Sequence, residues 1–133
     1  GLASPATRYI QALNLRTELL AAFNDMVFSQ VDVLMTPMMI MDVPTIEESD
    51  VGARPGAGEL LAKIGHCSRP VNFLGLPGLS VPSGFTKSGL PSSIQFIGRP
   101  FDEATLYRVG HAYERETSWH EMQPDPAKWE TLT

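Results

Sequence analysis

Two short stretches in which apolar and polar residues alternate constrain the fold of this chain more than any other feature. They occupy residues 79–82 and 93–98, with a loop around Ser88-Gly89 between them. Alternation with a period of two places successive side chains on opposite faces of a sheet. We therefore predict that these stretches form an antiparallel pair of strands.

A third strand is predicted at residues 31–36, where β-branched and apolar residues dominate and Pro37 ends the run. We expect this strand to be short and mostly buried. Its place in the sequence does not indicate which of the other two strands lies beside it. Two long amphipathic helices are available to cover so small a sheet, so the predicted class is α/β, with about three strands flanked by helices.

The longer of these helices is predicted to run from about residue 5 to residue 30. Ser4 is a suitable N-cap, and Pro5 suits the first helical position because it has no backbone N–H to leave unpaired. Apolar side chains recur at steps of three, four or seven and so share one face that must pack on another surface. They are Tyr9, Leu13, Leu20, Phe23 and Val27. Arg16 falls on that face, where we expect a snorkelling or ion-paired side chain.

The second helix is predicted to begin at Phe101-Asp102. Asp102 can act as its N-cap, and Phe101 and Leu106 hold the two positions of a hydrophobic staple. Arg115 lies near its C-terminal end, where a cation suits the helix dipole. One side of this helix is expected to pack closely, with a glycine that permits another backbone to approach. That side carries Leu106, Val109, Gly110 and Tyr113.

The rest of the chain is predicted to contain little regular structure. Residues 38–58, which include prolines, glycines and acidic residues, are expected to form an irregular loop, much of it exposed. Residues 59–64 can form a short helix that Gly65 ends in a left-handed conformation. Residues 123–133 are expected to form an extended tail. We interpret Asn72, Gly75 and Pro77 as residues that set a turn.

The composition excludes several classes of function. The 133 residues carry a formal net charge of −5, and no run of Lys or Arg forms a basic face, so no direct contact with nucleic acid is expected. No apolar stretch approaches the roughly 20 residues of a membrane span, so no membrane partner is expected. The lone cysteine, Cys67, excludes an internal disulfide and favours a cytoplasmic location. Because the chain begins with Gly1 rather than methionine, we expect a processed or cut chain.

Candidate catalytic groups are few. Cys67 follows His66, but sequence neighbours rarely have the geometry of a nucleophile and its base, and a free cysteine is more often inert. The histidines are too scattered for a metal site, no serine lies in a Gly-x-Ser-x-Gly elbow, and no phosphate-binding loop is present. We predict no metal, no cofactor and no catalytic residue. A methionine group either fills the core or forms an adaptable apolar pocket wall. It consists of Met35, Met38, Met39 and Met41.

Three runs along the chain together resemble the C-terminal region of the amidase signature family. They are residues 31–37 (VDVLMTP), 69–84 (RPVNFLGLPGLSVPSG) and 89–103 (GLPSSIQFIGRPFDE). Their order and spacing match as well, and the similarity continues to Trp119-His120, so it covers nearly the whole chain. The resemblance implies that residues 1–133 are the C-terminal portion of a large α/β/α sandwich built around a mixed sheet.

The family, which includes general amidases and the A component of the aminoacyl-tRNA amidotransferase, hydrolyses carboxamides through a serine nucleophile, a bridging cis-serine and a lysine base. The regions that carry those three residues do not occur in this sequence. The resemblance therefore implies a scaffold that is inactive alone. It also implies two kinds of partner, a small-molecule amide and either the remainder of the amidase chain or a second copy. A non-catalytic module that binds an amide or a protein partner is the alternative.

The resemblance also implies a set of substrate-binding residues, because two segments of the family fold approach the cleft. They map onto Met38, Met39, His66, Cys67 and Ser68. Family members commonly have threonine at the positions of Met38 and Ser68, so this wall is expected to be more apolar and to suit a less polar amide. In the tRNA amidotransferase component, the Asn-x-x-Gly-x-Pro motif is preceded by an acidic residue. Gly65 and His66 stand in that neighbourhood here, which favours a general amidase over an enzyme that takes glutamine as donor.

Overall fold

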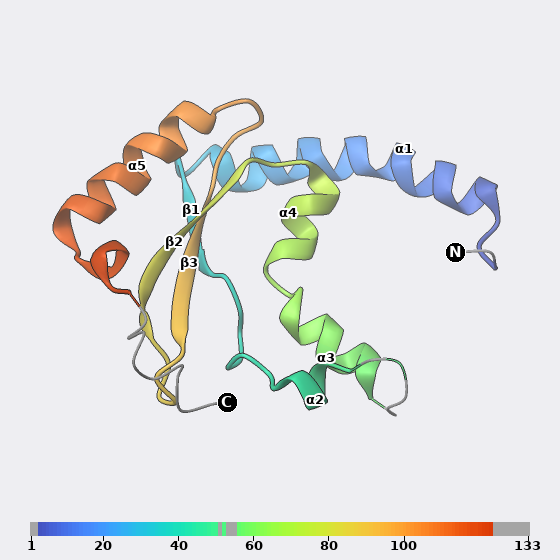
Figure 1. Ribbon diagram of the computed structural model, residues 1–133. Coiled ribbons are helices and arrows are strands. Elements are labelled where there is room, and N and C mark those ends of the chain that lie inside the picture. Colours follow the sequence, from blue (N-terminus) through green and yellow to red (C-terminus); the bar gives the residue numbers. More distant parts are fainter. Residues whose placement is uncertain (1–2, 51, 53–55, 124–133) are drawn as a thin grey trace.

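The computed structural model describes residues 3–50, 52 and 56–123 of the chain. It has one three-stranded sheet with helices on both faces (Figure 1), so the α/β prediction is confirmed. The strands are β1 (Leu34–Pro37), β2 (Gly78–Phe85) and β3 (Pro91–Ile97). No helix in the described ranges combines the length and hydropathy that a membrane span requires.

The sheet has the order β1-β3-β2, and both pairs of strands are antiparallel. The predicted pairing of the two alternating stretches is therefore confirmed, and β1 lies on the other side of β3. The prediction for β1 was wrong in two respects: it begins at Leu34 and includes Pro37, and Met35 is 60% exposed rather than buried. Proline is tolerated here because β1 is an edge strand of this sheet and need not donate on its outer side.

The N-terminal helix α1 (Ala6–Phe23) continues into a π-helical turn, η1 (Asn24–Phe28). The prediction of Ser4 as N-cap was wrong, since Pro5 holds that position and no side chain caps the helix. The C-terminal half of the predicted apolar face packs against the core, but Tyr9 and Leu13 near its start are exposed. Figure 1 shows why: the first turns of α1 extend beyond the rest of the molecule.

Three short helices separate β1 from β2: α2 (Ile46–Ser49), α3 (Ala57–Ile64) and α4 (Ser68–Leu74). Helix α2 interrupts the segment for which an irregular loop was predicted. Its signal was the capping box in which the Thr45 side chain accepts from the Glu48 N–H at 3.1 Å, while the Glu48 carboxylate accepts from the Thr45 N–H at 2.9 Å.

Helix α4 was not predicted, and the roles expected of two glycines around it were exchanged. Gly65 has φ −88°, so it does not end α3 in a left-handed conformation, and the chain passes through it almost directly into α4. Gly75 has φ 72° and is the left-handed residue that ends α4. Asn72 therefore lies in a helix rather than in a turn. The Arg16 guanidinium donates to the Leu74 carbonyl at 3.4 Å, where it satisfies one of the free carbonyls at this helix end.

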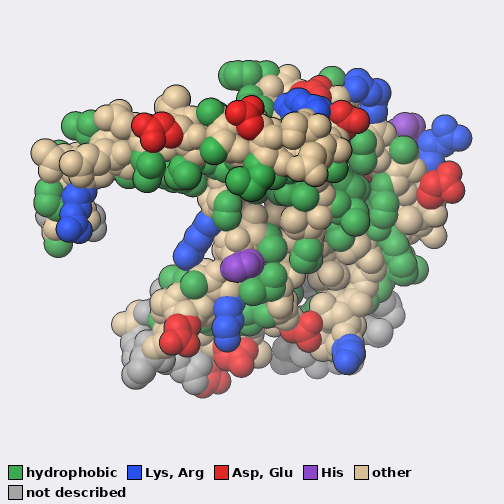
Figure 2. Space-filling model, turned by 180° about the vertical axis from the view of Figure 1, so that it is seen from behind, with side chains coloured by type: hydrophobic (Ala, Val, Ile, Leu, Met, Phe, Trp, Pro, Cys, Tyr) green, Lys and Arg blue, Asp and Glu red, His purple; other side chains and the backbone are tan. Residues whose placement is uncertain are grey.

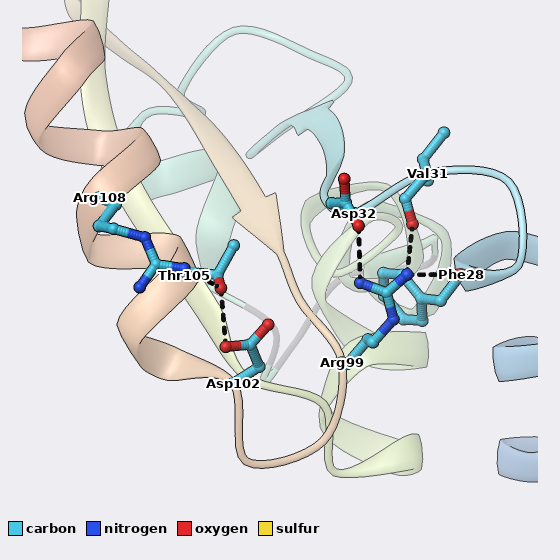
Figure 3. A network of polar contacts seen from close by, with 7 residues as sticks. All are labelled: Phe28, Val31, Asp32, Arg99, Asp102, Thr105 and Arg108. Carbon is cyan, nitrogen blue, oxygen red and sulfur yellow. Dashed lines mark hydrogen bonds and ion pairs between the residues drawn. The ribbon is translucent and has the colours of Figure 1, made fainter.

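The C-terminal helix α5 (Glu103–Glu116) is followed by a 3₁₀ turn, η2 (Trp119–Glu121). The staple prediction was wrong, because Phe101 has φ 63° and is 96% exposed, far from a packed position against Leu106. The Asp102 carboxylate accepts from the Thr105 hydroxyl at 2.7 Å instead of capping a backbone N–H (Figure 3). Of the predicted extended tail, all but Gln123 lies outside the described residues.

Each face of the sheet has its own apolar core. On one face Ile97 packs with α1, η1 and α4, through Phe28, Val71, Leu74 and Leu76. On the other face Phe96 and Val81 pack against Leu106 of α5. The predicted packing side of α5 is confirmed: Leu106 and Gly110 are buried, and Val109 and Tyr113 pack beside them. Alternation along β3 thus assigns neighbouring residues to different cores.

Candidate functional site

A pocket of about 280 Å³ lies between α4 and the sheet face that α4 covers. Segments distant in the sequence meet there: the chain after β1, the first turns of α4, and the facing parts of β2 and β3. It is lined by Met38, Ser68, Val71, Asn72, Leu76, Gly78, Ser80 and Gln95. None of these side chains is charged. The lining combines apolar surface with hydroxyl and amide groups, which suits a small neutral ligand.

Gln95 forms the polar centre of this pocket. It is 4% exposed and is the buried polar side chain of the described part of the chain. Its register partners are Thr36 on β1 and Ser80 on β2, so the three polar residues form a row across the sheet. Its amide nitrogen donates to the Thr36 hydroxyl at 3.0 Å and to the Cys67 carbonyl at 3.1 Å. A buried amide is stable only when such partners are present.

The structure brings together two of the five predicted substrate-binding residues. Met38 and Ser68 both line the pocket. Met39 is half-buried and His66 is exposed, and neither is among the lining residues. Cys67 contributes its backbone carbonyl to the Gln95 amide, while its half-buried thiol is free. The assignment of all five to substrate binding remains a prediction.

The groups considered for other chemistry are not assembled into a site. No hydrogen bond joins the side chains of His66 and Cys67 among the described residues, whose polar contacts there are made by backbone atoms. In the same part of the chain, no group of three or more His, Cys, Asp and Glu residues could hold a metal ion. The prediction that no metal is bound therefore meets no contrary arrangement within the described ranges.

Two larger hollows lie elsewhere. One, of about 500 Å³, borders the C-terminal end of α5 and is lined largely by charged residues. The other, of about 450 Å³, lies between η1 and Arg99. Figure 3 shows that Arg99 is occupied there: it donates to the Phe28 carbonyl at 2.6 Å and to the Asp32 carboxylate at 3.0 Å. Neither hollow contains any of the predicted substrate-binding residues.

Comparison with known proteins assigns the chain to a family. The model of the family described as Amidase matches residues 2–107. This chain belongs to the amidase family.

Individual amidase-family proteins support the same assignment. The chain is 43% identical over 120 residues to the A component of glutamyl-tRNA(Gln) amidotransferase from Chloroflexus aggregans, and 44% identical over 108 residues to that from Myxococcus xanthus. These matches cover 90% and 81% of this chain but only 23% and 21% of the relatives. The chain thus spans less than a quarter of the length of these relatives.

A solved structure shows the corresponding fold. The A component of glutamyl-tRNA(Gln) amidotransferase from Thermotoga maritima superposes with a TM-score of 0.66 at 28% identity, over 84% of this chain and 23% of that protein. The amidase-family resemblance indicated by the sequence motifs is therefore confirmed, as is the fold that it implied. Within this chain the described strands pair only in the antiparallel sense.

Sequence reasoning missed six residues that line the pocket. They are Val71, Asn72, Leu76, Gly78, Ser80 and Gln95. One signal was available for Gln95, because a long polar side chain stands between Ile94 and Phe96 in an otherwise apolar strand. No comparable signal marked the residues of α4, since that helix was itself not predicted.

Proposed function

We propose that this chain is the C-terminal part of an amidase that hydrolyses carboxamide C–N bonds to a carboxylic acid and ammonia or an amine. In this proposal it supplies scaffold and one wall of the substrate pocket. Membership of the amidase family supports the reaction class. The small share of each relative that the chain spans supports the division of labour, because the nucleophile then comes from another part of the protein.

The observation that carries the proposal is the uncharged lining of the pocket between α4 and the sheet. A neutral carboxamide offers two N–H donors and one carbonyl acceptor. Hydroxyl and amide side chains, here Ser68, Ser80 and Asn72, can pair with such groups without the cost of burying a charge. Met38 adds an adaptable apolar surface beside them. Met39, His66 and Cys67 complete the proposed wall.

The chain alone is proposed to be inactive. A serine hydroxyl is a weak nucleophile until a neighbouring base removes its proton. The described lysines, Lys63 on α3 and Lys87 between β2 and β3, are exposed, and neither lines the pocket that contains Ser68 and Ser80. The proposed chemistry uses no metal and no cofactor.

The proposed partners are the amide substrate and either the remainder of the amidase chain or a second copy; neither nucleic acid nor a membrane is proposed. The single cysteine supports a cytoplasmic location. The alternative function is that of an amidotransferase component, which the names of the relatives favour. The absence of a carboxylate from the described pocket lining favours the general amidase, since an amino acid substrate carries an ammonium group.

Purified full-length protein that contains this chain tests the proposal. We expect it to release ammonia from neutral carboxamides such as benzamide at least about tenfold faster than from glutamine, which corresponds to about 1.4 kcal/mol of discrimination. The 133-residue chain alone should show no turnover. Preference for glutamine would instead support the amidotransferase function. Turnover by the isolated chain, retained when His66, Cys67 and Ser68 are replaced, would arise from a contaminant, whereas loss of that turnover on replacement would contradict the proposal.

A further inference from the structure

The buried amide of Gln95 connects two segments that carry the pocket wall. Its orientation is fixed by chemistry, because the Cys67 carbonyl can only accept and the atom 3.1 Å from it must therefore be the NH₂ nitrogen. The same nitrogen lies 3.0 Å from the Thr36 hydroxyl. Both amide hydrogens are thus directed at groups on other elements, Thr36 on β1 and Cys67 immediately before α4.

These two contacts lie directly beside the residues that face the pocket. Thr36 is two residues before Met38, whose N–H donates to the Ser93 carbonyl on β3 at 3.0 Å. Cys67 is the residue before Ser68, with which α4 begins. Met38 and Ser68 both line the pocket. A shift of either segment relative to β3 would therefore change the separation of these two side chains.

We propose that Gln95 is a positioning residue for substrate binding, which sets the separation of Met38 and Ser68 by holding the end of β1 and the start of α4 to the central strand. The role of the pocket in binding an amide rests on the proposed function above; the connection itself rests on the two hydrogen bonds. Because Gln95 is 4% exposed, water cannot readily replace its amide as the partner of the Cys67 carbonyl.

Cys67 provides a direct measurement of the connection, since it is the lone cysteine of the chain and its thiol is free and half-buried. The experiment is alkylation of the full-length protein that contains this chain, with the rate at Cys67 followed by peptide mass spectrometry. Gln95→Met preserves the length and burial of the side chain but removes both donors. We expect it to increase the alkylation rate at Cys67 about tenfold, because the segment opens more often when a buried carbonyl loses its partner.

Two matched variants separate the connection from general loss of stability. Leu79→Ala removes packing on the opposite sheet face, in the core with Phe96 and α5, and should lower the melting temperature while leaving the Cys67 rate within about twofold of wild type. Thr36→Val removes one of the two hydrogen-bond partners of Gln95 and retains the Cys67 contact, so its rate should lie between those of wild type and Gln95→Met.

The enzymatic readout uses the same variants. Gln95→Met should raise KM for neutral carboxamides about tenfold with little change in kcat, because the pocket wall but not the nucleophile is displaced. Equal Cys67 rates in wild type and Gln95→Met, or a faster rate with unchanged KM, would overturn the positioning role. A full-length protein without amidase activity would contradict the proposed function instead, and the Cys67 rates would still decide whether Gln95 holds the two segments.

Discussion

At the scale of single residues, two glycines determine how closely the elements approach. A Cβ atom on Gly110 of α5 would lie 2.5 Å from Cδ2 of Leu79 on β2, so the glycine is needed for the close contact between helix and sheet. Gly75 has φ 72° and lies against the Arg16 guanidinium, so the end of α4 requires both the left-handed conformation and the missing side chain. Small changes at these positions should therefore have large effects.

Replacement of Gly110 by valine tests this dependence. We expect Gly110→Val to lower the free energy of unfolding by about 2 kcal/mol, because the added side chain forces Leu79 and the helix apart. Gly58 in α3 is the matched control, since a Cβ there would meet nothing within 4 Å. Gly58→Val should change stability by less than about 0.5 kcal/mol. Equal losses in urea denaturation would contradict the packing account.

A second substitution tests the polarity of the pocket wall. Met38→Thr should shift the preference of the full-length enzyme toward more polar amides, with a change of about tenfold in the ratio of kcat/KM values, since a hydroxyl replaces apolar surface. Met35→Thr on the preceding strand is the control, because Met35 is 60% exposed and is not among the pocket-lining residues. A ratio altered equally by both would show that Met38 does not contact the substrate.

At the scale of elements, Arg99 joins the end of β3 to the segment between η1 and β1. Its guanidinium donates to the carbonyls of Phe28 and Val31 and to the Asp32 carboxylate, and it lies 5.7 Å from the centre of the Phe28 ring (Figure 3). The Asp32 side chain is 86% exposed, so water screens this ion pair and its contribution is small. The two carbonyls, which end a helical segment, depend more on Arg99.

The prediction at this scale concerns Arg99→Met, which keeps most of the aliphatic chain but no donor. We expect a loss of about 2 kcal/mol in the free energy of unfolding, because charged donors to carbonyls are lost at a partly buried site. Asp32→Asn should cost less than about 0.5 kcal/mol. Arg108→Met on α5, where the exposed guanidinium donates to the Thr105 hydroxyl at 2.7 Å, is the matched control and should have a similarly small effect. Thermal denaturation of the three variants measures the order.

At the scale of the whole molecule, a small core contrasts with a large exposed apolar surface. Large apolar side chains on α1 that are exposed include Tyr9, Ile10 and Leu13. Figure 2 shows apolar side chains along the side of α1 that borders the hollow beneath it. Exposed apolar surfaces of this kind bind other protein surfaces or self-associate. The proposed remainder of the amidase, or a second copy, would cover this side.

The isolated chain should therefore self-associate and bind a hydrophobic dye such as anilinonaphthalene sulfonate. Leu13→Glu, on the exposed part of α1, should reduce both signals and leave the helical circular dichroism unchanged. Leu20→Glu is the contrasting variant: Leu20 packs against the core, so a buried carboxylate should cost about 3 kcal/mol or more and increase dye binding. A wild-type chain that is monomeric and does not bind the dye would contradict the exposure of this face.

Sequence alone determined the features that depend on local periodicity and turn chemistry. The alternating stretches predicted the pairing of β2 with β3, and the repeat of Leu106, Val109, Gly110 and Tyr113 predicted the packing side of α5. Both follow from the fixed geometry of strands and helices, in which spacing alone decides which side chains share a face. The motifs at residues 31–37, 69–84 and 89–103 indicated the family.

Only the tertiary structure decided how distant segments meet. It placed β1 beside β3, buried the Gln95 amide between Thr36 and Cys67, and brought Met38 and Ser68 to one pocket while leaving His66 exposed. It also formed α4 from a segment whose glycine and prolines indicated a turn, because Val71 and Leu74 are buried against Ile97 there. Burial and hydrogen bonds between residues far apart in the chain supply this information, and local sequence patterns do not contain it.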